Sequence, residues 1–157
     1  MDTYEWLLAL HVSGAFFFIG GSLFAGICNV LAQRSERPSE IALFLGLLRI
    51  SLPVVGIGAL ATLILGLWLV HHVHYSWGDF WVWGAIALWV ISSALGGLGG
   101  RVQRRARELA ERLATEGDVP SAELTALARD RGANLLNYGA GLAALLILVL
   151  MIWKPGA

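Results

Sequence analysis

The sequence predicts an all-α membrane protein: an up-down bundle of four transmembrane helices in one domain, residues 1–157. The first reason is composition, because 57% of the residues are hydrophobic, 14% are charged, and the mean hydropathy is +0.70. A soluble domain carries about 25% charged residues. The second reason is four apolar stretches, each long enough for the ~20 residues that a spanning helix needs. These observations exclude a water-soluble globule, a disordered chain and a nucleic-acid-binding protein.

The first span is expected at about residues 4–31. Asp2 and Glu5 have the spacing of a capping box, which begins a helix at this point. The same acidic residues stand where a cleaved signal peptide carries basic ones, and no A-x-A site follows. We therefore expect this span to be retained.

The second span is expected at about residues 50–72, after a segment that begins with Pro38-Ser39-Glu40. Ser39 is the expected N-cap of this segment. A single helix from Ser39 to the end of the span would be about 50 Å long, against a membrane core of about 30 Å. The segment therefore lies in the membrane interface or projects beyond it. Pro53 lacks an amide hydrogen, which predicts a kink.

The third span is expected at about residues 80–100 and the fourth at about 134–153. Helical periodicity continues after the third span, so we expect that helix to extend until Gly117, a C-cap residue. Pro120-Ser121-Ala122-Glu123 is a second helix start, with Ser121 as N-cap, and this segment is expected to run to about Arg131. The connection between helices three and four is thus predicted to be helical.

The basic residues predict the orientation of the chain. Ten of the eleven Lys and Arg residues lie in segments 32–49 and 101–133, whereas residues 71–79 contain none. The positive-inside rule makes the two basic segments cytoplasmic. Both termini are then outside the cytoplasm.

Six tryptophans lie near the outer ends of the expected spans. They are Trp6, Trp68, Trp77, Trp81, Trp83 and Trp153, with Tyr4 and Tyr75 beside them. Amphipathic rings settle at the lipid headgroups, so the pattern indicates an interfacial belt. An aromatic lid over a ligand is the alternative interpretation.

His11 is the most informative single residue, because an ionisable side chain inside a span marks a candidate functional site. The helix face beside it is mostly small and comprises Gly14, Ala15, Phe18, Gly21, Ser22 and Ala25. A small-residue face admits either a flat macrocycle or a neighbouring helix. Two interpretations stay open: cofactor binding by His11, Gly14, Phe18 and Gly21, or a hydrogen-bonded histidine at a helix contact.

Three further histidines, His71, His72 and His74, follow the second span, with Asp79 nearby. Neutral imidazole binds copper, zinc and haem iron, and Asp79 can add an oxygen ligand. His71 is also a candidate to share a cofactor with His11, if the first two spans are neighbours. Ordinary interfacial histidines are the alternative.

A polar set is expected where three spans reach the basic segments. It comprises Asn29, Arg49, Asn134, Asn137 and Tyr138. It forms either a pocket for a headgroup, quinone or anion, or hydrogen bonds between helices. The single cysteine, Cys28, excludes an internal disulfide and a cysteine-based metal site.

Several short motifs carry a family resemblance. They are Leu10-His11-Val12-Ser13-Gly14-Ala15, Gly20-Gly21, Leu65-Gly66-Leu67-Trp68, Trp77-Gly78-Asp79-Phe80-Trp81, Arg104-Arg105, and Met151 with Lys154-Pro155-Gly156. With these the chain resembles, over nearly its whole length, the domain-of-unknown-function family 2269 of predicted bacterial integral membrane proteins. The resemblance implies four spans and no assigned activity. We expect the protein to lie in the bacterial cytoplasmic (inner) membrane.

The pattern of His11 followed by Gly20-Gly21 is more distantly similar to copper-resistance-D-type proteins and to the membrane-embedded protoporphyrinogen oxidase. These relatives imply copper handling in the first case, and haem b binding with porphyrinogen oxidation in the second. The similarity carries over His11 alone, as a candidate ligand.

The leading functional hypothesis is therefore a membrane protein that binds haem b or copper and has a redox or electron-transfer role. The metal ligands would come from His11, His71, His72, His74 and Asp79. The alternative is a cofactor-free accessory or scaffold protein that acts through helix–helix association. The expected partners are the lipid bilayer and a second copy of the chain, and no catalytic triad or carboxylate pair is identifiable.

Overall fold

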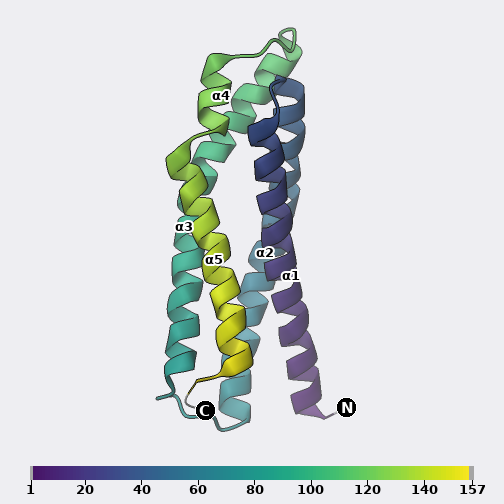
Figure 1. The fold of residues 1–157 in the computed structure, drawn as a ribbon. Helices are drawn as coiled ribbons and strands as arrows, with labels where there is room; N and C mark the ends of the chain where they lie inside the picture. The colour runs from purple at the N-terminus through teal and green to yellow at the C-terminus, as the bar shows by residue number, and fades with distance from the viewer. Residues whose placement is uncertain (1, 156–157) are drawn as a thin grey trace.

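The computed structural model describes residues 2–155, and these form five α-helices and no strand (Figure 1). The helices are α1 (Thr3–Arg34), α2 (Pro38–His72), α3 (Phe80–Thr115), α4 (Ala122–Ala128) and α5 (Arg131–Trp153). The predicted all-α class is confirmed. Gly156, part of the C-terminal motif, lies outside the described residues.

Four helical stretches are long and apolar enough to cross a membrane: α1, α2, α3, and α4 together with α5. Their most apolar windows have mean hydropathies between 1.6 and 2.3. Large apolar side chains such as Phe16, Ile57 and Ile152 are exposed on the outside of the bundle. An apolar exterior of this extent is typical of a surface that faces lipid.

The bundle consists of two hairpins, α1 with α2 and α3 with α5, which appear side by side in Figure 1. The hairpins meet mainly through α2 and α3, whereas α1 and α5 touch much less. Both ends of the described chain lie at one end of the bundle, which we call the termini end. We call the other end, which carries α4, the arginine-rich end. It holds ten of the eleven Lys and Arg residues.

The start of the first helix confirms the predicted capping box. The Asp2 carboxylate accepts a hydrogen bond from the Glu5 backbone N–H at 2.9 Å, and the Glu5 carboxylate accepts one from the Asp2 N–H at 3.0 Å. Two donors that the helix itself cannot satisfy are thereby paired.

The α1–α2 contact brings two helix backbones together at Gly58. A Cβ atom at Gly58 would lie 2.7 Å from the Phe18 backbone N and 2.8 Å from the Gly14 carbonyl oxygen. Only a residue without a side chain fits between these helices at this point.

Helix α2 is continuous from Pro38 to His72, with Pro53 inside it. The expectation that Ser39 is the N-cap is wrong: the N-cap is Arg37, and Ser39 lies in the first turn. The first turn of α2 is capped instead by the side chain of Asp118. The Asp118 carboxylate accepts hydrogen bonds from the Ser39 backbone N–H and from the Ser39 hydroxyl, both at 2.7 Å. A carboxylate at a helix N-terminus satisfies a free donor and opposes the positive end of the helix dipole.

The first part of α2 packs into a small core at the arginine-rich end. Side chains of this core include Ile41 and Leu45 of α2, Ala106 and Ala110 of α3, and Leu124 of α4. The α2 segment before the expected second span therefore projects along the helix axis and packs against α3 and α4.

The connection after the third span is helical, as predicted, but is divided differently. Helix α3 extends to Thr115, with Glu116 as C-cap and Gly117 at φ +119° after it. Ser121 is the N-cap of α4. That helix ends at Ala128 rather than near Arg131, because Asp130 caps a new helix through the Ala133 N–H at 2.7 Å.

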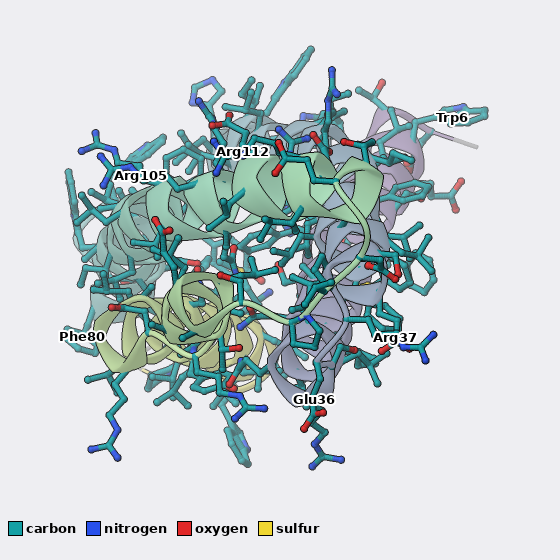
Figure 2. The ribbon with its side chains drawn as sticks, turned by 90° about the horizontal axis from the view of Figure 1, so that it is seen from above. Trp6, Glu36, Arg37, Phe80, Arg105 and Arg112 are labelled. Carbon is teal, nitrogen blue, oxygen red and sulfur yellow. The ribbon has the colours of Figure 1, made fainter. Side chains whose placement is uncertain are left out.

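The arginine-rich end carries its charges on the outside. Figure 2 shows Arg105 and Arg112 projecting from α3, and Arg37 projecting from the start of α2. Basic side chains placed in this way can reach anionic lipid headgroups.

The Asp118 cap predicts a specific pH dependence of stability. Hydrogen bonds from Ser39 lower the pKa of the Asp118 carboxyl below its ordinary value. A lowered folded-state pKa adds stability above the unfolded pKa of about 3.9, and this stability is lost as the pH falls through the folded pKa. Replacement Asp118→Asn should therefore lower the unfolding temperature at pH 7 and reduce its fall on acidification to pH 3, measured by circular dichroism in detergent. Glu36→Gln is the control in the α1–α2 loop, and an equal acid response in wild type and Asp118→Asn would contradict the cap.

Candidate functional site

A cavity of about 330 Å³ lies between the two hairpins near the termini end. All four long helices contribute to its wall, and most of its lining side chains are apolar. The side chains on the wall with a polar atom are those of His11, Thr62, Tyr75, Trp81, Trp89 and Lys154, and the Trp89 Nε1–H already donates to the Ala59 carbonyl oxygen at 3.1 Å.

The His11 side chain reaches from α1 into the α2 side of the wall. A Cβ atom at Gly66 would lie 2.9 Å from His11 Cε1, so glycine at this position admits the imidazole ring. The ring also lies within hydrogen-bonding reach of the Thr62 backbone on α2, although no bond there meets strict hydrogen-bond geometry. His11 Nδ1 is buried and has no hydrogen-bond partner among residues 2–155. Buried polar atoms in native structures nearly always have a hydrogen-bond partner, so an unpartnered nitrogen at this position is unusual.

Lys154 closes the cavity at the termini end, together with Tyr75 and Trp81. The residue directly follows α5 in a left-handed conformation, with φ 40°. Its Nζ donates a hydrogen bond to the Tyr75 hydroxyl at 3.2 Å and lies 4.8 Å from the Tyr75 ring centroid. It also lies 5.6 Å from the Trp81 ring centroid. A cation over two aromatic faces is held by their quadrupoles as well as by the hydrogen bond.

Trp81 is the buried member of the group formed by Lys154, Tyr75 and Trp81. The indole is 3% exposed and packs edge-to-face against Tyr75, with ring centroids 5.4 Å apart. Its Nε1–H is buried and lacks a partner among the described residues. Two residues that line the cavity, one from each hairpin, therefore each carry a buried nitrogen without a partner among the described residues, and Lys154 lines the same wall. A largely apolar ligand with hydrogen-bond acceptors matches such a wall.

The structure separates the residues that the sequence grouped around His11. Phe18 lines the cavity, but Gly14 and Gly21 face α2: Cβ atoms there would lie 3.0 Å from Thr62 Oγ1 and 2.6 Å from Val55 Cγ2. Of the two interpretations for these glycines, the helix contact is the one that the geometry favours.

The histidines after the second span do not reach the cavity. His71, His72 and His74 are exposed at the termini end, and Asp79 is the half-buried N-cap of α3. None of the four lines the cavity, so the structure does not bring His71 to His11. Within residues 2–155, no group of three or more His, Cys, Asp or Glu side chains could hold a metal ion.

From the sequence, Trp81 is expected in an interfacial belt, and Lys154 is expected in a family motif but not in the site. Five of the six tryptophans named for that belt are exposed, and Trp81 is the buried exception. Tyr75 and Trp81 both line the cavity, and the alternative of an aromatic lid over a ligand stays a prediction. A signal for Lys154 was present, since it is the one basic residue at the end of the chain opposite the arginines.

In the polar set at the arginine-rich end, Asn29, Asn134 and Tyr138 form hydrogen bonds between helices, whereas Asn137 Nδ2 is buried and has no partner among the described residues. Asn29 Nδ2 donates to Asn134 Oδ1 at 3.0 Å, and Gln103 Nε2 donates to Asn29 Oδ1 at 2.7 Å. Gln33 Nε2 adds a bond to the Tyr138 hydroxyl at 3.3 Å. These bonds join α1, α3 and α5. Arg49 is exposed and stands apart from them.

Comparison with protein-family models gives one match that covers nearly the whole chain. The family model described as "Predicted integral membrane protein (DUF2269)" matches residues 5–155. Comparison with curated proteins and with solved structures found no match.

Proposed function

Because the chain belongs to the DUF2269 family of predicted integral membrane proteins, we propose that it acts within the bilayer by binding a redox-active cofactor in the cavity beside His11. One observation carries the proposal: His11 lines an apolar cavity, and its buried Nδ1 has no partner in hydrogen-bond geometry among residues 2–155. An ionisable side chain inside a spanning helix is costly, so it marks a functional site.

Haem b and copper are the two cofactors that the sequence predicts His11 could bind. The donor chemistry fits both, because the Met151 thioether lines the same cavity from α5, and imidazole with thioether binds haem iron or Cu(I). The size of the cavity fits haem less well. A cavity of about 150 Å³ holds one benzene molecule, so about 330 Å³ has room for roughly two six-membered rings rather than a four-ring macrocycle.

The orientation of the protein is also part of the proposal. Ten of the eleven Lys and Arg residues lie at the arginine-rich end, and cytoplasmic connections of membrane proteins are enriched in them. This supports an arginine-rich end in the cytoplasm of a bacterium, both termini outside, and a cavity in the outer half of the inner membrane.

The test is a cofactor analysis of the protein purified in mild detergent from cofactor-replete cells. The visible spectrum is recorded oxidised and reduced, bound metals are measured by mass spectrometry, and an organic extract is analysed for redox-active lipids. We expect one cofactor per chain, reduced at least tenfold in His11→Ala and retained in the control His72→Ala, whose imidazole is exposed. A wild-type preparation without any of these cofactors would contradict the proposal and favour the scaffold function.

A further inference from the structure

We infer that the cavity binds the ring of a lipid-soluble quinone, with one carbonyl at the His11 side and the other at the Trp81–Lys154 side. The inference rests on the proposed function and names the class of its cofactor. It concerns binding, and it is carried by the size of the cavity, the placement of its polar groups and its access to lipid.

The size of the cavity selects a small ring system. Its volume of about 330 Å³ is roughly twice the ~150 Å³ that accommodates benzene. A benzoquinone or naphthoquinone ring has one or two six-membered rings and falls within this volume. The aromatic side chains of Phe18, Trp81 and Trp89 line the cavity and offer apolar faces to a flat ring.

The polar groups of the wall are divided between the two hairpins. His11 reaches the cavity from α1, whereas Trp81 and Lys154 reach it from α3 and from the end of α5. A neutral imidazole N–H, an indole N–H and an ammonium group are all hydrogen-bond donors. A 1,4-quinone has an acceptor at each of two opposite edges, which matches donors on two sides. A fatty-acid carboxylate has its acceptors at one end, so it would leave the donors of one side unpaired, which weakens binding.

The weakly packed side of the bundle gives such a ligand access from the membrane. Helices α1 and α5 touch little, and both contribute apolar side chains to the cavity wall, among them Leu8, Val12, Leu148 and Ile152. All four side chains are exposed on the outside of the bundle. An isoprenoid tail can pass between these two helices into the bilayer while its ring occupies the cavity.

The test is a titration of the detergent-purified protein with decyl-benzoquinone and with a naphthoquinone, followed by quenching of tryptophan fluorescence. Trp81→Phe and Lys154→Met each remove one donor, and each should raise the Kd about three- to tenfold, which is the effect of losing one net hydrogen bond. Trp83→Phe is the matched control: its indole is 60% exposed and donates to the Trp77 carbonyl oxygen, so the Kd should not change. Helical circular dichroism and a single gel-filtration peak identify variants that fold.

Three results would overturn the inference. Decanoate that competes with decyl-benzoquinone at equal affinity would make the site a carboxylate site. Haem or copper in the purified protein, without quinone binding, would leave the proposed function standing and remove this inference. Failure of every cofactor to bind would remove both. Saturable quinone binding that weakens in both cavity variants, but not in Trp83→Phe, is the result we expect.

Discussion

Replacement of Gly58 by leucine should destabilise the bundle by about 1–3 kcal/mol or more relative to replacement of Gly56 by leucine. At Gly58 the first side-chain atom would already lie within 2.8 Å of two backbone atoms of α1, the Phe18 N and the Gly14 O. Backbone atoms cannot move aside as a side chain can, so α1 and α2 must separate. The free energy of unfolding is measured by titration of the detergent-solubilised protein with sodium dodecyl sulfate.

Gly56 provides the matched control for this prediction. It lies in the same helix, two residues away, and a Cβ atom there would meet nothing within 4 Å. Both substitutions gain the same helix propensity, about 1 kcal/mol for replacing glycine, so this gain cancels in the comparison. Equal stabilities of Gly58→Leu and Gly56→Leu would show that α1 and α2 do not meet as described.

The second large effect is expected in the buried amide network at the arginine-rich end. Asn29 is 4% exposed and uses both ends of its amide, toward Asn134 and Gln103. Asn29→Leu leaves the half-buried Gln103 amide without this partner, whereas Asn134 Oδ1 keeps a hydrogen bond from Gln33 Nε2 at 3.2 Å. Each group left unpaired costs about 1–3 kcal/mol. We expect Asn29→Leu and Asn134→Leu each to lower the free energy of unfolding by an amount in this range, in the same detergent titration.

The double variant separates pairing from simple loss of polarity. Removing both partners of a hydrogen bond costs less than the sum of the single losses, because neither partner is left unpaired. Hydrogen bonds between helices in membranes couple by about 0.6 kcal/mol on average and up to about 1.7 kcal/mol. Strict additivity of Asn29→Leu and Asn134→Leu would show that these two amides are not bonded to each other.

Local signals in the sequence predicted the helices well. The capping box at Asp2 and Glu5 depends on residues three apart, and the four apolar stretches depend on composition alone. The extension of α3 through the basic segment follows from helical periodicity, which is also local. These features need no knowledge of which helices touch.

The site could be predicted only in part, because it depends on contacts between distant segments. His11 was identified from its position in a span, and the lid interpretation of the aromatic residues was kept open. The burial of Trp81 and the position of Lys154 follow from the packing of α3 against α2 and of α5 against α3. The Asp118 cap joins residues 79 positions apart, so no local pattern at Ser39 reveals it.

The most direct test of the cavity as a binding site is native mass spectrometry of the chain released from detergent micelles. We predict one bound molecule per chain, with the mass of an isoprenoid quinone, in wild type and in His72→Ala. The adduct should disappear when His11→Ala and Trp81→Phe are combined. A wild-type chain that carries no adduct, or an adduct that persists in the combined variant, would contradict the account.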